Sequence, residues 1–282
     1  MKHITIIGCG LIGGSFAALV KKYHSNNTIL GIGRRTEPLK QAVKKGLIDQ
    51  FALDINAEQI EQTDMVVLAT PISTILPMIE TLNNLISKSL IIIDFSSVKS
   101  FLNDPIVTSS HHKIVPLHPM GGRDVQGLDY AASDVLENCP LITFDRNSNS
   151  EINAFFSQCS FKLIHCKSYK EHDEWMANIS HGPYLIASLI PILLSQKEPS
   201  ELRALSEVSA GGFRDTTRVS NSAIEWGMDI LAGNKIPLLS FLNDIERTIG
   251  TLKRQLENDQ YTVLEQTLKT AKKTRQIIVN DT

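Results

Sequence analysis

The chain has 282 residues, 42% hydrophobic and 21% charged, which is a globular composition with enough apolar residues for one large domain or two ordinary ones. Its formal net charge of −2 gives no electrostatic basis for binding nucleic acid. No block of like charges indicates a membrane-binding tail, and the longest apolar run, residues 185–194, is too short to cross a bilayer. We therefore expect neither nucleic acid nor membrane as a partner.

Four cysteines occur without a C-x-x-C pair, which is typical of small buried side chains in a reducing cytoplasm. Lys2 ahead of an apolar run superficially resembles a secretory signal. The glycines that follow fit a loop between a strand and a helix better. The sequence therefore favours a cytoplasmic location.

The segment Gly8-Cys9-Gly10-Leu11-Ile12-Gly13 is a G-x-G-x-x-G motif between a predicted strand, residues 4–7, and a predicted helix, residues 15–22. In this context the first glycine permits a tight turn, the second makes room for a pyrophosphate and the third lets the helix pack on the strand. The helix N-terminus offers N–H groups to the phosphates. We predict dinucleotide binding, and the candidate cofactor residues here are Gly8, Gly10, Leu11, Ile12 and Gly13.

A second predicted strand, residues 28–33, ends where NAD enzymes commonly place a carboxylate for the ribose 2′-hydroxyl. This chain has Arg34 and Arg35 instead, and arginine binds phosphate through a planar fork of donors. The alternative is a pair of solvated surface arginines. The pattern favours NADP over NAD.

Strands and helices then alternate, and the strands are apolar throughout, which is typical of a parallel sheet covered on both faces. Thr70, Pro71 and Ser96 follow two of these strands, at the sheet edge that faces a cofactor, and join the candidate cofactor residues. The predicted strands are 64–69 and 90–94, and the predicted helices are 38–45 and 75–86.

Residues 113–122 deliver one histidine, His118, from a short strand to a turn rich in proline and glycine. A turn at a sheet edge is a place for a reactive side chain, although the residue alone also fits a structural loop histidine. His111 and His112 do not complete a metal site, because no cysteine or carboxylate cluster accompanies them. We expect residues 141–144 and 162–166 to be the closing strands of this domain.

The pattern changes to helices from about residue 167. His181 lies beside a stripe of small and polar residues at helical spacing, and Pro183 predicts a kink because it removes a helical hydrogen bond. The kink either opens space for a ligand or serves packing. The stripe consists of Asp173, Ala177, Ser180, Tyr184 and Ala187.

Residues 201–208 are predicted to be helical, and residues 210–218 interrupt that pattern with two glycines and two arginines. This interruption is either a surface loop or a clamp in which Arg214 and Arg218 bind a carboxylate. Ser222 with Glu225 predicts a capping box for the next helix.

A coiled-coil-like seam predicts either an internal helix contact or a dimer contact, and we favour a homodimer. The predicted fold class is an α/β Rossmann-type doubly wound sheet, residues 1–166, followed by an all-α dimerisation domain, residues 167–282. The seam consists of Leu238, Leu242, Ile245, Ile249, Leu252 and Leu256.

Taken together, the motifs resemble the prephenate and arogenate dehydrogenases of tyrosine biosynthesis along nearly the whole chain. The arginines after the second strand look most like the NADP-using arogenate dehydrogenases. The matching segments are residues 8–15, 70–72, 94–99, 118–120, 172–173, 180–181 and 212–218.

The resemblance implies roles for individual residues. His118 matches the catalytic histidine that hydrogen-bonds the ring hydroxyl of the substrate, and Ser97 matches a serine that helps to orient both. His181 and Arg218 match substrate-binding positions, Arg218 for a carboxylate, with Arg214 a weaker candidate. The implied reaction is oxidative decarboxylation of prephenate or arogenate with hydride transfer to NADP, or less favourably NAD.

Two positions depart from the family pattern. Tyr184 stands where many members have a second histidine, and Arg123 stands where a small or hydroxylated residue is more usual. The sequence does not decide between prephenate and arogenate. The alternative functions are a dehydrogenase of β-hydroxy acids, which ordinarily relies on a lysine in the helical domain, and a dimeric NADP-binding sensor without enzymatic activity.

Overall fold

The computed structural model describes residues 1–123, 125, 127–144 and 150–279. By its internal contacts the chain forms two compact units, Met1–Lys235 and Ile236–Thr282. The division predicted from the sequence, residues 1–166 and 167–282, stays a prediction. Asp124, which follows the unusual Arg123, lies outside the described residues.

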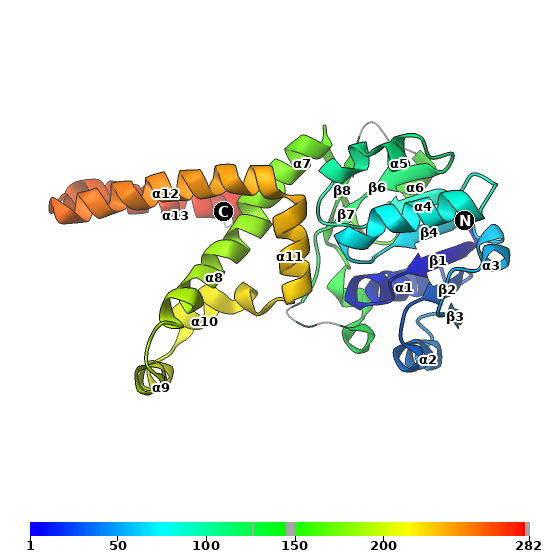
Figure 1. The fold of residues 1–282 in the computed structure, drawn as a ribbon, viewed down its shortest axis with the longest axis horizontal. Helices are drawn as coiled ribbons and strands as arrows, with labels where there is room; N and C mark the ends of the chain where they lie inside the picture. Colours follow the sequence, from blue (N-terminus) through cyan, green and yellow to red (C-terminus); the bar gives the residue numbers. More distant parts are fainter. Residues whose placement is uncertain (124, 126, 145–149, 280–282) are drawn as a thin grey trace. The chain divides into compact units, whose positions relative to one another are not determined.

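A six-stranded parallel sheet forms the centre of the first unit, with strand order β3-β2-β1-β4-β5-β6 (Figure 1). This order is that of a doubly wound dinucleotide-binding sheet, and it reverses direction between β1 and β4. The predicted α/β fold class is therefore confirmed. The strands are β1 (His3–Ile7), β2 (Thr28–Ile32), β3 (Gln50–Ala52), β4 (Met65–Leu68), β5 (Ile91–Asp94) and β6 (Lys113–Pro116).

Helices cover both faces of the sheet because each strand is apolar on both sides. Phe16 of α1 and Leu39 of α2 belong to one buried cluster, together with Phe156 of α6. Ile60 of α3 and Ile79 of α4 belong to the cluster on the other face. The bounds are α1 (Leu11–Tyr23), α2 (Thr36–Lys44), α3 (Ala57–Glu61), α4 (Ile75–Leu85), α5 (Pro105–Thr108) and α6 (Ser150–Gln158).

A second, three-stranded sheet contains the segments 141–144 and 162–166, which we expected to be the closing strands of this domain. It contains β7 (His118–Pro119), β8 (Pro140–Phe144) and β9 (Lys162–Cys166), with β7 antiparallel to β8 and β8 parallel to β9. The chain thus leaves the main sheet after β6 and enters the small sheet at His118, which pairs with Ile142. The catalytic candidate lies where the two sheets meet.

The helical part of the first unit begins with a continuous helix, Tyr169–Leu194, that contains α7 (Tyr169–Met176), a π turn (Ala177–His181) and α8 (Gly182–Leu194). By length and composition alone this helix could cross a bilayer; the core helix of a soluble protein passes the same test. Three shorter helices follow, α9 (Pro199–Glu207), α10 (Gly211–Thr217) and α11 (Ile224–Gly233).

Two local predictions in this part are wrong. The segment 210–218 does not interrupt the helical pattern: it is α10, followed by a 3-10 helix, Arg218–Asn221. The expected capping box also fails, because Ala223 is the N-cap of α11 and the Ser222 hydroxyl donates to the Val219 carbonyl instead. The glycines of α10 stand at its first positions, where they leave a helix intact.

The second unit consists of α12 (Lys235–Glu257) and α13 (Tyr261–Val279). The predicted seam lies on α12. Leu238 is buried, whereas Ile249 and Leu256 are more than half exposed. Among its described residues this unit buries almost no side chains, so the two helices have no core of their own.

Candidate functional site

The glycine loop lies between β1 and α1, where the strand order reverses. Gly8 has φ +97°, a left-handed conformation, and a side chain there would meet the Ala69 carbonyl of the neighbouring strand end at 2.6 Å. A side chain at Gly13 would meet the Gly8 carbonyl at 2.3 Å. Both glycines are therefore required by close packing, as the motif predicts.

The middle glycine has a different environment. A Cβ at Gly10 would meet nothing within 4 Å, so the space in front of the loop is open. Gly10 is also the N-cap of α1 and provides no side-chain hydrogen bond, which leaves the first N–H groups of that helix for a ligand. An open cradle at a helix N-terminus fits the pyrophosphate of a dinucleotide. Leu11 and Ile12 form the first turn of α1, half-buried.

Arg34 and Arg35 follow the end of β2 and are both exposed. Arg35 is the N-cap of α2. No ion pair or hydrogen bond of these two guanidinium groups occurs among the described residues. The structure thus leaves both groups available at the edge where the adenosine ribose binds in this fold.

The ends of β4 and β5 contribute the next candidates. Thr70 accepts a hydrogen bond from Thr74 at 2.9 Å, and Pro71 is the N-cap of a short 3-10 helix, Ile72–Thr74. Ser96 is buried, and its hydroxyl is 2.8 Å from the Val98 carbonyl and 3.0 Å from an Asp94 carboxylate oxygen. Ser96 is thus used in shaping the loop after β5, and its predicted contact with the cofactor stays a prediction.

A fully buried ion pair fastens this loop. The Lys99 ammonium contacts the Asp94 carboxylate, and both side chains are completely excluded from solvent. The same ammonium donates to the Leu117 carbonyl at 3.0 Å, directly before His118. Burial lowers the pKa of Lys99, and the Asp94 charge opposes that effect. The sequence analysis gave neither residue a role.

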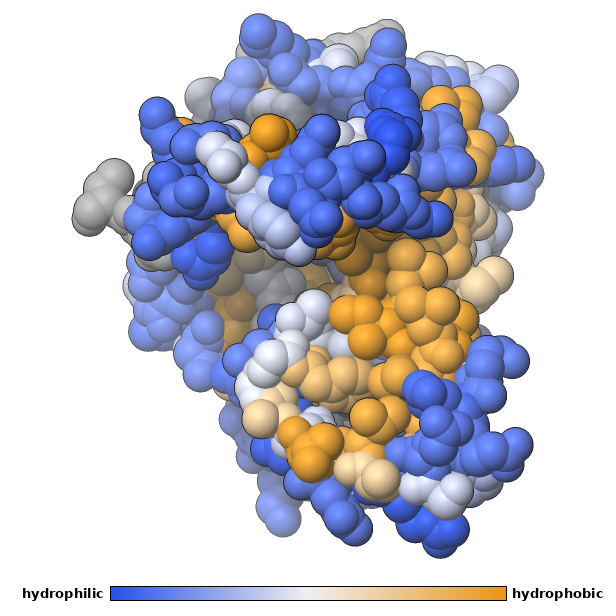
Figure 2. All heavy atoms as spheres, turned by 90° about the vertical axis from the view of Figure 1, so that its left-hand side faces the viewer, coloured by the Kyte–Doolittle hydropathy of each residue, from blue (hydrophilic) through white to orange (hydrophobic). Residues whose placement is uncertain are grey.

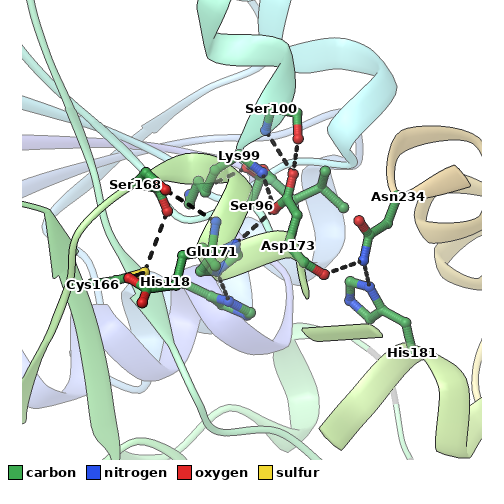
Figure 3. Close-up of polar contacts among 12 residues, drawn as sticks. Ser96, Lys99, Ser100, His118, Cys166, Ser168, Glu171, Asp173, His181 and Asn234 are labelled. Carbon is green, nitrogen blue, oxygen red and sulfur yellow. Dashed lines mark hydrogen bonds and ion pairs between the residues drawn. The ribbon is translucent and has the colours of Figure 1, made fainter. Parts of the chain in front are cut away.

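His118 is buried, with 9% of its surface exposed. Its Nδ1 atom is 2.9 Å from Nε2 of His172, and Nδ1 of His172 is 2.7 Å from the Asp173 carboxylate. Figure 3 shows the hydrogen bonds around Asp173 and the strand ends. No described hydrogen bond uses Nε2 of His118, so this atom remains for a ligand.

His181 lies at the end of the π turn, completely buried. The side-chain amide of Asn234 donates to the Asp173 carbonyl at 2.9 Å and to Nδ1 of His181 at 3.0 Å (Figure 3). Asp173 precedes His181 by eight positions, about 80° apart on an unbroken α-helix. A π turn adds about one residue, or about 100° of rotation, and so brings both groups to the face that Asn234 reaches.

A π turn, Ala177–His181, precedes Pro183, which lies in the first turn of α8, and the kink expected from Pro183 stays a prediction. Because Nδ1 of His181 accepts from Asn234, its proton is on Nε2. That Nε2 atom is buried without a hydrogen-bond partner among the described residues. A buried donor without a partner is costly, and a substrate oxygen would satisfy it.

Burial is the largest cause of the lowered pKa values of His118, His172 and His181. It lowers the pKa of His118 well below 6.5, and the nearby charges of His172, Lys99 and His181 act in the same direction. It also lowers the pKa of His172 despite the hydrogen bond to Asp173, and that of His181 to about 4. Histidines of this kind are neutral at pH 7, which is the state a proton acceptor requires.

The remaining predicted residues lie around this centre in different ways. Ser97 is half-buried in the loop after β5, between the buried Ser96 and Lys99. Arg218 is exposed and starts the 3-10 helix after α10, where it has a contact within the chain. Arg214 is exposed on α10 and lines an apolar hollow with Leu194 of α8, away from the histidine network.

The residues predicted to form the site do not include His172, Asp173, Asn234, Lys99 and Asp94, although all of these except Asn234 lie in segments that match the family. The signal for them is weak, because 54 residues separate His118 from His172 and 61 separate Asp173 from Asn234. Only the folded chain brings them together.

A dinucleotide-binding sheet with a neutral, buried histidine beyond its carboxyl edge defines the class of nicotinamide-dependent dehydrogenases. Comparison with known proteins specifies the family. Residues 16–159 match the model of the prephenate dehydrogenase nucleotide-binding domain, and residues 168–270 match that of the prephenate dehydrogenase dimerization domain. The chain belongs to the prephenate dehydrogenase family, and its oxidoreductase class is thereby confirmed.

Curated relatives agree. Prephenate dehydrogenase of Bacillus subtilis is 31% identical over 279 residues, which cover 95% of this chain and 74% of that protein. Cyclohexadienyl dehydrogenase of Zymomonas mobilis is 28% identical over 285 residues, which cover 99% of this chain and 97% of that protein.

Solved structures have the same fold. Arogenate dehydrogenase of Synechocystis aligns with a TM-score of 0.78 and 26% identity over 97% of this chain and 99% of that one. Prephenate dehydrogenase of A. aeolicus, solved with hydroxyphenyl propionate and NAD+, aligns with a TM-score of 0.87 and 24% identity over 99% of this chain and 98% of that one.

Proposed function

We propose that this enzyme catalyses the NADP-dependent oxidative decarboxylation of prephenate or arogenate in tyrosine biosynthesis. The observation that carries the proposal is His118, held neutral and nearly excluded from water where the two sheets meet. The family models and the curated relatives support the reaction class. They do not favour the β-hydroxy acid dehydrogenase or the sensor.

The mechanism needs one proton acceptor. Nε2 of His118 accepts the proton of the ring hydroxyl while a hydride leaves the same carbon, and the nicotinamide, when bound, supplies the hydride acceptor. Loss of the ring carboxylate as CO2 then makes the ring aromatic, and the proton held by His118 returns to the phenolate oxygen. Since aromatisation drives the reaction, the protein mainly positions the substrate and holds one proton.

Further side chains are proposed to bind the substrate. The Nε2–H of His181 is a buried donor without a partner, and it would bind a carboxylate or hydroxyl oxygen. Arg218 is proposed as the carboxylate clamp and Ser97 as the group that orients the ring hydroxyl, both on the family resemblance. Arg214 is the weaker candidate, because it lines a separate apolar hollow.

The cofactor is proposed to be NADP. Arg34 and Arg35 are exposed directly after β2, where their guanidinium groups can reach a ribose 2′-phosphate. The open space at Gly10 would take the pyrophosphate. Thr70, Pro71 and Ser96 are proposed to lie near the nicotinamide, from the strand ends β4 and β5.

A homodimer is proposed from the apolar surface that a single chain leaves uncovered. Leu193 and Val208 are 72% and 76% exposed. Val208 lines an apolar hollow of about 580 Å³ between α8, α9 and α10, as does Leu194, the neighbour of Leu193 in the chain. Figure 2 shows hydrophobic side chains exposed on the side of the chain that faces the viewer. Patches of this kind mark interaction sites, and a match to a dimerization domain favours a second copy as the partner.

We also propose a cytoplasmic location, since the four cysteines are free thiols.

The decisive experiment measures reduction of NADP+ and NAD+ with prephenate and with arogenate, in all four combinations. Reduction with one or both substrates, together with release of CO2, supports the proposal. Nucleotide binding without turnover of either substrate would favour the sensor, and turnover of a β-hydroxy acid would favour the other dehydrogenase class.

A further inference from the structure

Asp173 accepts hydrogen bonds from four donors. One carboxylate oxygen accepts from the Lys99 N–H at 2.8 Å and from Nδ1 of His172 at 2.7 Å. The other accepts from the N–H of Ser100 at 2.8 Å and from its hydroxyl. Burial by itself would raise the pKa of Asp173, but the bonds from His172 and Ser100 outweigh it, so the pKa lies below its usual range.

An ionised carboxylate only accepts hydrogen bonds, so the proton of His172 must be on Nδ1. Neutral His172 then has a lone pair on Nε2, which faces Nδ1 of His118 at 2.9 Å. Two lone pairs cannot share that contact, and therefore Nδ1 of His118 carries the proton. The remaining nitrogen of His118, Nε2, is left as an acceptor.

We propose that His172 and Asp173 are positioning residues that fix His118 in the tautomer protonated on Nδ1, with Nε2 free to accept the substrate proton. This inference deepens the proposed function and rests on it for its catalytic meaning. The tautomer itself is a property of the free protein, independent of any substrate.

The hydrogen bonds of His118, His172 and Asp173 also determine which residue carries the positive charge after His118 accepts the substrate proton. When Nε2 of His118 gains the hydroxyl proton, the proton on Nδ1 of His118 can pass to Nε2 of His172. The proton on Nδ1 of His172 remains bonded to that nitrogen and hydrogen-bonded to Asp173. The result is a neutral His118 and an imidazolium at His172 beside the carboxylate. In this transfer the substrate O–H bond and the Nδ1–H bond of His118 break, and N–H bonds form at Nε2 of His118 and at Nε2 of His172. The protons return along the same path.

Other polar groups lie near His118 and His172. Lys99 and Asp94 form a closed ion pair nearby, and His181 has the opposite tautomer because Asn234 donates to its Nδ1. The two histidines thus present different groups: an acceptor Nε2 on His118 and a donor Nε2–H on His181. An acceptor for the ring hydroxyl and a donor for an anionic oxygen are what this class of substrate requires.

Nitrogen-15 NMR of the full-length protein, labelled at histidine and free of substrate, tests the tautomer directly. At pH 7.5 we expect His118 and His172 each to have a protonated Nδ1 and an unprotonated Nε2, and His181 the reverse. Single substitutions of the histidines assign the signals. A His118 protonated on Nε2, or doubly protonated, would overturn the inference whatever the substrate is.

A pair of variants tests the catalytic consequence. His172→Gln keeps an oxygen that can accept from Nδ1 of His118, whereas His172→Leu removes the acceptor. We expect His118 to stay protonated on Nδ1 only in the glutamine variant. The kcat of the leucine variant should be at least about tenfold lower than that of the glutamine variant, since a wrong tautomer in other enzymes costs up to about 10⁴-fold.

The controls separate this effect from misfolding. The Kd of NADP+ should be the same for both variants, and His111→Gln, an exposed histidine elsewhere, should retain the wild-type kcat. Equal kcat values and equal tautomers in the glutamine and leucine variants would refute the positioning role. A correct tautomer in a protein that turns over neither prephenate nor arogenate would instead refute the proposed function alone.

Discussion

Single residues at this site derive their chemistry from burial. His118 and His181 are both imidazoles excluded from water, and their pKa values lie below 6.5 because burial disfavours the charged form. Their hydrogen-bond partners differ, since one contacts a histidine and the other an asparagine. The same residue type therefore has two different hydrogen-bond arrangements within the candidate site.

The catalytic role of His118 is tested by His118→Asn, which preserves polarity and approximate size but removes the base. We expect kcat to fall by roughly 10²–10⁴-fold, with little change in nucleotide affinity. Because the pKa of His118 lies below 6.5, the acidic limb of the wild-type kcat profile should lie below pH 6.5 and should flatten in the variant. Wild-type kcat with the same acidic limb would make His118 a structural residue.

Arg34 is proposed to select NADP over NAD. Arg34→Ala should weaken NADP+ binding by about 1.5–3 kcal/mol, the cost of a lost charged hydrogen bond, and should weaken NAD+ binding far less. Isothermal titration with both nucleotides measures the difference. Lys40→Ala, another exposed cation on α2, is the control. Equal losses for the two nucleotides would contradict the assignment of the 2′-phosphate.

Arg218 is proposed to bind the substrate carboxylate through the fork geometry of its guanidinium group. Arg218→Lys keeps the charge but loses the two-pronged donor. We expect a clear rise in KM for the substrate while the Kd of NADP+ stays nearly constant. Steady-state kinetics with saturating nucleotide measure it, and an unchanged KM would exclude Arg218 as the clamp.

Elements differ in how well the sequence predicts them. The strands β1, β2, β4 and β5 are apolar runs bounded by polar, glycine or proline residues, and their positions are predicted within about two residues. The short strand β3, Gln50–Ala52, is not predicted, because three residues give no hydrophobic pattern. The helix α10 is missed because Gly211 and Gly212 suggest a loop, although both occupy its first turn. The strands β8 and β9 are predicted, but their separate three-stranded sheet is not, since periodicity does not specify a pairing partner.

The exposed apolar faces of α8 and α12 predict the oligomeric state. Leu193 and Ile249 are 72% and 56% exposed, so an aspartate at either position disturbs no buried contact of the single chain. Leu193→Asp and Ile249→Asp should convert the dimer to monomer. Leu53→Asp, at a leucine 45% exposed in the nucleotide-binding part, should not.

Light scattering at micromolar concentration measures this change in mass. A wild-type chain that is monomeric under those conditions would refute the dimer. Loss of the dimer with Ile249→Asp alone would show that the predicted seam on α12, rather than the face of α8, carries the contact.

The whole molecule should lose stability in acid for a definite reason. Three buried histidines have pKa values below the unfolded value of about 6.5, so the unfolded state binds more protons between pH 6.5 and the folded pKa values. Stability is therefore fully present above pH 6.5 and falls as the pH decreases. For His181, with a folded pKa of about 4, the loss is about 3 kcal/mol by pH 4.

Urea unfolding at pH 7.5, 6.5, 5.5 and 4.5 measures this loss. The free energy of unfolding should stay nearly constant between the first two values and fall over the last two. His181→Gln should flatten part of that fall. A flat profile throughout would show that the buried histidines titrate normally.

For the whole molecule, the fold class and the order of the α/β and helical regions can be predicted from the sequence. The hydrogen bonds between the residues of the candidate site cannot. Motifs whose residues are contiguous in the chain, such as the glycine loop, can be recognised directly in the sequence. The contacts of His118 with His172, and of Asn234 with His181, join segments more than fifty residues apart. Neither a helical period nor a propensity encodes which of these polar groups meet.

The π turn between Ala177 and His181 has a consequence for how this chain tolerates change. A deletion of one residue there would leave the hydropathy, charge and length of the long helix almost the same. It would nevertheless turn every later side chain by about a quarter of a circle. His181 would leave Asn234, and Leu193 would leave the apolar face, in a single event. The proposed substrate contact of His181 and the proposed dimer contact of Leu193 would therefore be lost together, since both depend on the same extra residue.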